Sequence, residues 1–597
     1  MPPENLSTLI TPVATPRAGR RSLLLAGTAV LLAIGAGLLA EALSALIGLL
    51  TSLSFHGRIA LDASPADNHL GPWVILVPIV GALIVGVMAR YGSPAIRGHG
   101  IPEVMERILR HESRIAPGIT ILKPVSTAIS IGTGGPFGAE GPIIATGGAL
   151  GSMIGQMLRV TAEERKMLLA AGAAAGMAAI FGAPVSATIL AFELLLFEYK
   201  PSSLAPVALA TATATVVRYL FHGSAPVFAV PDILASPGGE AMTAYVLLGA
   251  IVGYLSVSVT RALYRVEDWF ETLPIHWMWW PALGAVVVGV LGYFEPRILG
   301  VGYGNITQLL NGTLIGRAAL VLITLKCIAW VIALGSGTAG GTMAPLFTIG
   351  GGAGSVLASV TIALFPAIGV DVRIGALVGM AAMFTGASRA LLTSVVFAFE
   401  ATRQPLALLP LLAGCTGAYL ISLLRMRDTI MTERLVRRGV PVVTEYAVDY
   451  LSQVTAGDRA SREVVTLAAE QPLALTHAWL EEGGPGTSHQ GFPVVDASGA
   501  VVGLLTRRDL LAPPVGATVV QDLIHRPLVA AYEIHTLREV ADLMVRHRVG
   551  RVPIISADGT RQLVGILSRS DVLAAHEQRL EAGTRAEPTI RLAFPMG

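Results

Sequence analysis

The chain has 597 residues, of which 53% are hydrophobic and only 14% are charged, and its formal net charge is +2 at pH 7. Soluble globular proteins carry about a quarter charged residues, so a deficit this large predicts an integral protein of the lipid bilayer and argues against a soluble one. The near-neutral charge balance argues against a nucleic-acid partner.

The N-terminal segment, residues 1–18, is polar and is predicted to be a cytoplasmic tail. Arginines just before the first apolar run place this end in the cytoplasm by the positive-inside rule, and arginines between residues 425 and 438 place the C-terminal part there too. Because both ends are expected in the cytoplasm, the chain should cross the membrane an even number of times. The membrane is expected to be the cell's inner or plasma membrane. Cys327 and Cys415 lie in apolar stretches and predict neither a disulfide framework nor a metal site.

Apolar segments alternate with short breaks from about residue 19 to residue 425. Helices broken at membrane depth are tolerated only where they are buried in protein or line a cavity, so the interrupted segments predict an internal site. Segments long enough to span the bilayer are 22–53, 72–90, 241–262 and 406–424. Segments shortened by glycine or proline are 119–133, 139–158, 184–197 and 344–365.

Three glycine-rich motifs lie in these breaks: GHGIPE at 98–103, GTGGPFGAEGP at 132–142 and GSGTAGGTMAP at 335–345. Each places a proline where a first helical turn is expected. Helix N-termini expose unpaired N–H donors and the positive end of the helix dipole, so they bind anions without a cationic side chain. A cation site would call for carboxylates or rings of carbonyls. The motifs therefore predict an anion site.

The membrane region contains an internal duplication. The segment 335–355 repeats the pattern of 132–152 at a constant offset of 203 residues, and GMAAMF at 379–384 repeats GMAAIF at 176–181. We therefore expect two membrane halves, residues 19–222 and residues 240–440, the second including an exit helix. Duplicated halves with matching breaks are typical of transporters that bind their substrate at the repeat interface.

Glu140 is the sole ionisable residue between Lys123 and Arg159. A carboxylate in a low-dielectric interior is costly unless donors solvate it or it is protonated. Glu140 can compete with an anion for the same N–H groups and leave on protonation, which makes it a candidate proton-sensitive gate. The alternative is a carboxylate that only caps the helix it begins.

The C-terminal region changes character. Residues 441–580 regain charge, and 492–511 and 552–573 share a pattern of strand, glycine turn, strand and helix start, which predicts a soluble α/β repeat. The last residues, 581–597, are predicted to be a disordered tail. Both repeats place a hydroxyl three residues before an acid, a spacing that a helix capping box alone explains. These residues are Thr506 with Asp509 and Ser568 with Asp571.

The three motifs, in this order and spacing, resemble those of the CLC family of chloride channels and chloride/proton antiporters, and the C-terminal repeat resembles paired CBS domains. The resemblance implies an all-α polytopic membrane protein, an inverted repeat of broken helices, followed by a cytoplasmic α/β CBS pair. It also implies a homodimer with one pore per subunit, Glu140 as the gate, no required cofactor, and adenine nucleotide (ATP, ADP or AMP) at the CBS residues named above. The implied anion-binding residues are His99, Gly138, Ala139, Gly141, Thr342, Met343 and Met431.

Departures from the family pattern bear on mechanism. His99, Met343 and Met431 stand where the family usually has serine, phenylalanine and tyrosine. His99 either donates to the anion or turns toward protein or the inner vestibule; protonated, it would attract an anion strongly. Leu194 stands where well-known antiporters have an internal proton-carrying glutamate. The neighbouring Glu193 and its repeat counterpart Glu400 are expected to be structural, bonded to local N–H groups.

These departures favour a gated chloride channel, with a proton-coupled chloride antiporter as the alternative. Selectivity for chloride over other anions stays open. An enzyme is not expected, because the chain has no nucleophile constellation and no HExxH-type metal motif. A cation transporter regulated by CBS domains is disfavoured because the apolar interior lacks carboxylate clusters.

Overall fold

The structure is a computed structural model that describes residues 20–584 except 197–198, 234–235, 441–450 and 452–453. It contains two compact units, one ending at Thr444 and the other beginning at Glu445. The predicted N-terminal tail lies outside the described residues, and so does most of the predicted C-terminal tail. The first residues of the latter are helical, because the final helix α22 runs from Arg569 to Thr584.

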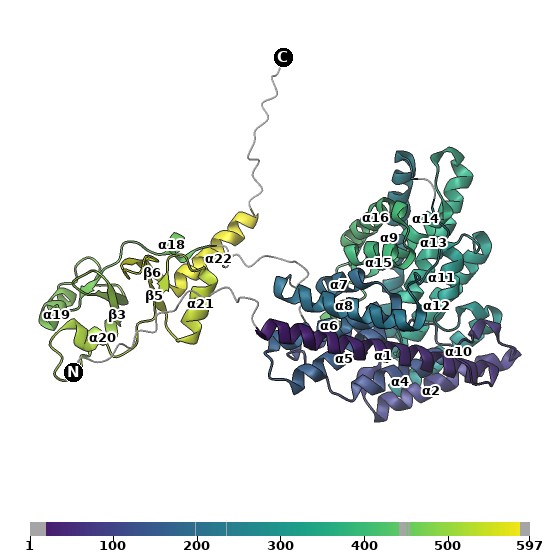
Figure 1. The fold of residues 1–597 in the computed structure, drawn as a ribbon, viewed down its shortest axis with the longest axis horizontal. Coiled ribbons are helices and arrows are strands. Elements are labelled where there is room, and N and C mark those ends of the chain that lie inside the picture. Colours follow the sequence, from purple (N-terminus) through teal and green to yellow (C-terminus); the bar gives the residue numbers. More distant parts are fainter. Residues whose placement is uncertain (1–19, 197–198, 234–235, 441–450, 452–453, 585–597) are drawn as a thin grey trace, which may run out of the picture. The chain divides into compact units, whose positions relative to one another are not determined.

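The membrane unit is built from two series of helices in the same order (Figure 1). The first series is α1 (Arg20–His56), α2 (Leu76–Tyr91), α3 (Ile101–Arg110), α4 (Ile119–Gly132), α5 (Glu140–Met157), α6 (Ala162–Phe181), α7 (Pro184–Leu190) and α8 (Pro201–His222). The second is α9 (Gly239–Glu271), α10 (Trp280–Phe294), α11 (Tyr303–Leu310), α12 (Gly316–Gly335), α13 (Met343–Leu364), α14 (Val372–Ser388), α15 (Leu391–Thr402) and α16 (Leu408–Arg425). The short α17 (Glu433–Arg437) follows.

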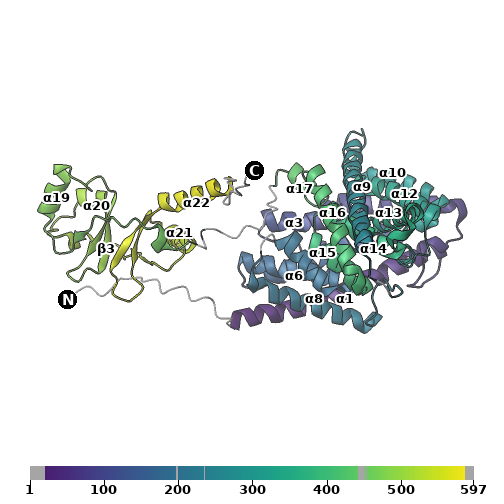
Figure 2. The same ribbon diagram turned by 90° about the horizontal axis from the view of Figure 1, so that it is seen from above.

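The predicted spans and breaks are confirmed in their positions. Among the described residues, eight helices are long and apolar enough to cross a membrane. Three of the interrupted segments become helices of 18 residues or fewer, and α7 continues into a π-helical turn, Ala191–Leu196. The fourth, 344–365, is instead the 22-residue α13 and is itself one of the eight. The long α9 packs beside α16, as α1 packs beside α8 (Figure 2).

Part of the duplicated glycine pattern is explained by helix packing. A Cβ atom added at Gly151 of α5 would lie 2.2 Å from the Leu168 carbonyl of α6, and one at Gly354 of α13 would lie 2.1 Å from the Gly375 carbonyl of α14. Both pairs of helices therefore touch backbone to backbone, which only glycine permits. The later glycines of each repeated segment set this packing and do not line the central site.

Two half-buried carboxylates join the halves reciprocally. Glu193 accepts hydrogen bonds from the N–H groups of Leu392 and Thr393 at 3.1 and 3.0 Å, at the start of α15. Glu400 accepts from the N–H groups of Val185 and Ser186 at 3.0 and 2.8 Å, at the start of α7. Both glutamates are structural, as predicted. Their partners are not local, however, because each caps a helix of the opposite half.

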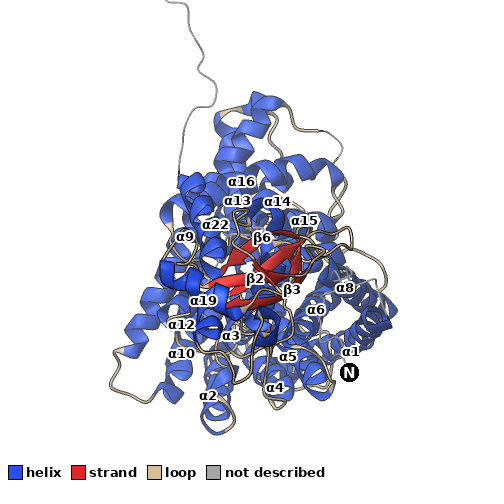
Figure 3. Cartoon of the chain, turned by 90° about the vertical axis from the view of Figure 1, so that its left-hand side faces the viewer, coloured by secondary structure: helices blue, strands red, loops and turns tan. Residues whose placement is uncertain are grey.

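The C-terminal unit consists of two small sheets flanked by helices, and Figure 3 draws its strands in red. Each sheet has a central strand that pairs parallel with a two-residue strand and antiparallel with a six-residue strand. The sheets are β1 (Leu467–Ala468), β2 (Gly491–Val495) and β3 (Val501–Thr506), then β4 (Ala531–Tyr532), β5 (Arg551–Ile555) and β6 (Leu563–Ser568). The helices are α18 (Ala456–Arg459), α19 (Leu473–Glu482), α20 (Arg507–Leu511), α21 (Leu537–Arg546) and α22.

Candidate functional site

The three glycine motifs meet at the centre of the membrane unit. The Gly138 N–H donates to the Gly341 carbonyl at 3.2 Å, and the Gly341 N–H donates back to the Gly138 carbonyl at 2.9 Å. The Gly340 N–H reaches the Gly98 carbonyl at 3.4 Å. The backbone of each half is thus bonded directly to the other, so the two copies of the broken-helix motif form one site.

The close approach of these loops leaves no room for side chains. A Cβ atom at Gly141 would lie 2.0 Å from the His99 carbonyl oxygen, and one at Gly341 would lie 2.5 Å from the Gly138 carbonyl oxygen. A Cβ atom at Gly138 would overlap the carboxylate of Glu140. Glycine is required at Gly141 and Gly341 by contact between backbones, and at Gly138 by the position of the Glu140 side chain.

Three helices begin at this junction with their N-termini inside the protein: α3 at Ile101, α5 at Glu140 and α13 at Met343. A proline lies in the first turn of each, as the sequence predicted. The first N–H groups of a helix have no intrahelical acceptor, so each N-terminus offers donors to a ligand. The hydroxyl of Thr342, the residue before α13, is buried and has no hydrogen-bond partner among the described residues.

Glu140 lies at the start of α5 and is 0% exposed. Its Oε1 accepts a 2.7 Å hydrogen bond from the Tyr303 hydroxyl, whereas Oε2 is enclosed and has no hydrogen-bond partner among the described residues. The backbone N–H groups of Glu140 and of Ala344 act on the carboxylate electrostatically. The carboxylate therefore occupies the space between the helix N-termini of both halves.

Tyr303 is a site residue that sequence reasoning missed. A signal for it exists, because GVGYGN at 300–305 repeats the pattern of GHGIPE at 98–103. Tyr303 begins α11, the second-half counterpart of α3, and its ring packs edge-on against Phe181 and Phe228. The second half thus supplies the hydroxyl that holds the first half's carboxylate.

Two buried lysines were also missed, and they too are related by the repeat. Lys123 donates to the carbonyls of Ile96 and Gly98 at 2.8 and 3.1 Å, just before α3. Lys326 donates to the carbonyls of Ile298 and Gly300 at 2.8 and 2.7 Å, just before α11. Each lysine fixes the turn that precedes a short helix, and each adds a positive charge near the site.

His99 and Met431 lie on one side of the junction. His99 is 4% exposed, its Nδ1 has no hydrogen-bond partner among the described residues, and its ring lies close to the Ile430 carbonyl. Met431, which follows Ile430 in the chain, is fully buried. The structure therefore brings His99 close to the chain segment that contains Met431.

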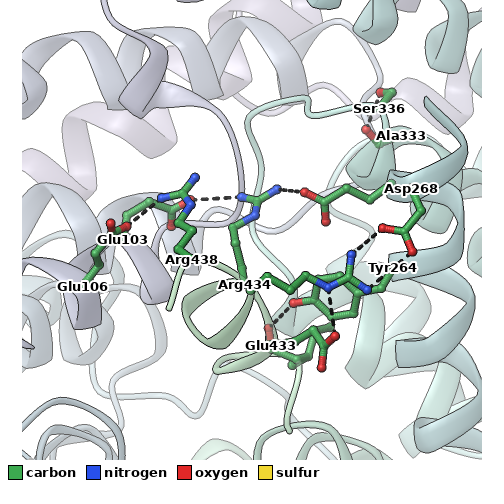
Figure 4. A network of polar contacts seen from close by, with 12 residues as sticks. Glu103, Glu106, Tyr264, Asp268, Ala333, Ser336, Glu433, Arg434 and Arg438 are labelled. Atoms are coloured by element: carbon green, nitrogen blue, oxygen red, sulfur yellow. Dashed lines mark hydrogen bonds and ion pairs between the residues drawn. The ribbon is translucent and has the colours of Figure 1, made fainter. Parts of the chain in front are cut away.

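A network of charged residues lies on the same side of the junction as His99 (Figure 4). Arg434 of α17 contacts Glu103 of α3 at 3.4 Å and Glu267 of α9 at 2.6 Å. Arg438 contacts Glu106 of α3 at 2.7 Å. The last helix before the C-terminal unit is thus tied to the helix that follows His99. We call this face of the membrane unit the linker side.

A cavity opens toward the junction from each side. On the linker side, a cavity of about 610 Å³ is lined by charged residues that include Glu103, Lys123 and Arg434. A second cavity of about 440 Å³ is lined by Ala139, Tyr303 and the C-terminal ends of α1, α6 and α8. These helices begin on the linker side, where Arg165 at the start of α6 donates to the carbonyl of Glu112 in the turn that follows α3, so the second cavity opens on the far side. Repeat-related α3 and α11 therefore line opposite cavities, which makes the repeat inverted.

The nucleotide candidates of the C-terminal unit form capping boxes. Asp509 Oδ2 accepts from the Thr506 hydroxyl at 2.7 Å and from its N–H at 2.8 Å, and Asp571 accepts from the Ser568 hydroxyl and N–H at 2.7 Å each. Burial raises the pKa of Asp509, but the hydrogen bonds from Thr506 outweigh this and the pKa is lowered overall. These residues are already satisfied without a ligand.

Taken together, the fold and the site define a polytopic membrane transport protein with inverted halves that meet at buried helix N-termini. The model of the voltage gated chloride channel family matches residues 81–423, and CBS domain models match residues 456–513 and 520–577. The chain belongs to this CLC family, carries a CBS pair, and is not an enzyme.

Similar proteins agree with this membership. The chain is 27% identical over 354 residues to a ClcB-like chloride channel protein of Ralstonia nicotianae, covering 58% of the chain and 82% of the relative. It is 28% identical over 377 residues to the H(+)/Cl(-) exchange transporter ClcA of Salmonella paratyphi B, covering 61% and 79%.

Solved structures share the fold. A slow cyanobacterial Cl-/H+ antiporter matches with a TM-score of 0.63 and 22% identity over 71% of this chain and 98% of its own. A eukaryotic CLC transporter matches with a TM-score of 0.59 and 19% identity over 92% and 98%. A CLC-type fluoride/proton antiporter matches with a TM-score of 0.57 and 21% identity over 68% and 96%.

Proposed function

We propose that the chain conducts chloride across the membrane as a gated channel, with Glu140 as the gate. The carrying observation is the buried Glu140 carboxylate, held by Tyr303 between the N-termini of α5 and α13. In that place it takes the N–H donors that an anion would use. Protonation removes the negative charge that these donors attract, so the side chain can leave and an anion can enter.

The proposed anion ligands are the helix N-termini and the residues around them. His99 and Met431 close the linker side, and Thr342 supplies a buried hydroxyl that has no partner among the described residues. The remaining ligands are the backbone N–H groups at Gly138, Ala139, Gly141 and Met343. Because methionine and histidine stand in this pathway, the preference for chloride over other halides is a property to be measured.

The side chains near Leu194 favour a channel over coupled exchange. Leu194 is buried and cannot carry a proton. The adjacent Glu193 accepts two N–H bonds and a 2.6 Å bond from the Thr393 hydroxyl, which commits it to capping α15. Neither residue offers a free carboxylate that would pass a proton between the linker side and Glu140.

A chloride/proton antiporter is the second candidate, and one observation favours it. Glu103 lines the linker-side cavity, and its Oε2 accepts a 2.8 Å bond from the Gly100 N–H, one residue from His99. Glu103 therefore provides a carboxylate on the linker side, so a proton pathway through it needs no carboxylate at position 194, where Leu194 stands. The relatives named as exchange transporters are consistent with this reading.

Simultaneous recording of chloride and proton movement separates the two candidates. The full chain is reconstituted in vesicles, and a chloride gradient is imposed across the membrane. A channel is expected to move chloride with no uphill proton movement. Proton uptake against its gradient, driven by chloride, would defeat the channel proposal in favour of exchange, and absence of any chloride flux would defeat both.

We further propose that the protein acts as a homodimer in the cell's inner or plasma membrane, with both termini in the cytoplasm. We also propose that the CBS pair regulates transport by binding an adenine nucleotide. Thr506, Asp509, Ser568 and Asp571 lie at the two strand-to-helix junctions of the CBS pair.

Nucleotide binding is measured by calorimetry with ATP, ADP or AMP on the full chain. Asp509→Asn and Asp571→Asn are expected to weaken binding roughly tenfold or more, because each loses a charged hydrogen-bond acceptor. Since both substitutions also disturb a capping box, unchanged thermal stability in the absence of nucleotide is the control. No heat of binding to the wild-type chain at millimolar nucleotide would leave these residues with a capping role alone.

A further inference from the structure

The far-side cavity contains a buried guanidinium that forms no ion pair with any of the described residues. Arg218, near the end of α8, lines this cavity and is 9% exposed. Its Nε donates a long hydrogen bond of 3.3 Å to the Ile180 carbonyl, and its Nη1 is enclosed without a hydrogen-bond partner among the described residues. Glu41, a carboxylate that lines the same cavity, acts on Arg218 electrostatically from a distance, but its hydrogen bond of 2.8 Å is to His222.

A buried charge is costly unless a counter-charge or a full set of hydrogen bonds accompanies it. A guanidinium has five N–H donors, and the Ile180 carbonyl uses one. Across the same cavity lies the first turn of α11, preceded by Gly302 in the left-handed conformation, and its first N–H groups have no intrahelical acceptor. The wall at Arg218 and the wall at the start of α11 thus each present N–H donors to the cavity.

The cavity also ends at the gate. Tyr303, which begins α11, lines the cavity and donates its hydroxyl hydrogen to Glu140. Ala139, the residue before Glu140, lines it as well. Tyr303 therefore links this cavity directly to the Glu140 carboxylate.

We propose that the far-side cavity is a second anion site, in which the Arg218 guanidinium binds a small monovalent halide such as chloride. This inference rests on the proposed function and extends it: the site holds an anion on the far side of Glu140, ready to move inward when the carboxylate leaves. The competing explanation is purely structural, since Arg218 also caps the C-terminal end of α6 through Ile180, where a cation is favourable.

Arg218→Gln separates the two explanations because glutamine keeps an N–H donor for the Ile180 carbonyl but removes the charge. The matched control is Arg58→Gln, which removes an exposed arginine just after α1, outside the cavity. Bromide is the probe, located by its anomalous scattering in crystals of the full chain. We expect a bromide ion within hydrogen-bond distance of the Arg218 guanidinium in the wild type and in Arg58→Gln, and none there in Arg218→Gln.

Flux through the same variants gives an independent reading. Loss of a charge-assisted contact is expected to raise the half-saturating chloride concentration roughly tenfold in Arg218→Gln, with no change in Arg58→Gln. A cavity without bromide in the wild type, or a bromide that persists in Arg218→Gln with unchanged half-saturation, overturns the second site while leaving chloride transport intact. Absence of flux in the wild type counts instead against the proposed function.

Discussion

Glu140→Gln is expected to give anion flux that is high at all pH values, whereas flux through the wild-type chain falls as pH rises. The deprotonated carboxylate is attracted by the N-termini of α5 and α13 and by the Tyr303 hydroxyl, so the closed state is favoured when Glu140 is charged. Lowering the pH protonates the group and opens the pathway. Glutamine fills the same space but is neutral at every pH, so its occupancy of the site is weak and independent of pH.

The size of the effect follows from the contacts that are lost. Hydrogen bonds to a charged group contribute about 1.5–3 kcal/mol, which corresponds to roughly 10- to 100-fold in the closed-to-open equilibrium. Tyr303→Phe keeps the carboxylate and removes only the hydroxyl donor, so flux is expected to rise by a smaller factor while the dependence on pH remains. The measurement is chloride efflux from vesicles over a series of pH values.

Glu240→Gln is the matched control, since Glu240 is an exposed carboxylate in the first turn of α9 and lies outside both cavities. It is expected to leave flux and its pH dependence unchanged. If Glu140→Gln retains the pH response of the wild type, the gate lies elsewhere, and Glu140 is only a buried carboxylate that begins α5.

The fold could be predicted from the sequence more completely than the candidate site. The 203-residue offset located matching breaks in both halves, because helix N-termini buried at the repeat interface need glycine and proline at fixed positions. The same offset did not distinguish two uses of glycine. Gly138, Gly141 and Gly341 form the junction, whereas Gly151 and Gly354 allow helices to pack closely. Both roles appear in the sequence as glycine, and they are distinguished only by which backbone lies opposite the glycine in the structure.

Residues contributed by the weaker copy of a motif were harder to predict. GVGYGN differs from GHGIPE at four of six positions, so Tyr303 did not stand out although it contacts Glu140 directly. Lys123 and Lys326 bond to carbonyls more than twenty residues away. Glu193 and Glu400 cap helices of the opposite half. Such partners are set by the inverted symmetry of the fold, and local sequence patterns carry no information about it.

Gly141→Ala is expected to abolish transport in a chain that still assembles in the membrane. A Cβ atom there would lie 2.0 Å from the His99 carbonyl oxygen and 3.3 Å from the Gly341 Cα. Neither neighbour is a flexible side-chain end, so the loops at 98–100 and 138–141 must separate. Overpacking of this kind costs about 1–3 kcal/mol of folding free energy. A displacement of roughly 1 Å at a positioned site costs on the order of a hundredfold in rate.

Gly27→Ala supplies the comparison, because a Cβ atom at Gly27 meets nothing within 4 Å and the residue lies inside α1, outside both cavities. Alanine there is expected to keep normal flux and to raise helix stability by up to about 1 kcal/mol. Flux and thermal stability are measured on both variants after reconstitution. Normal flux through Gly141→Ala would mean that the two loops can part without losing the pathway, and that the backbone junction between the inverted halves does not form the conducting site.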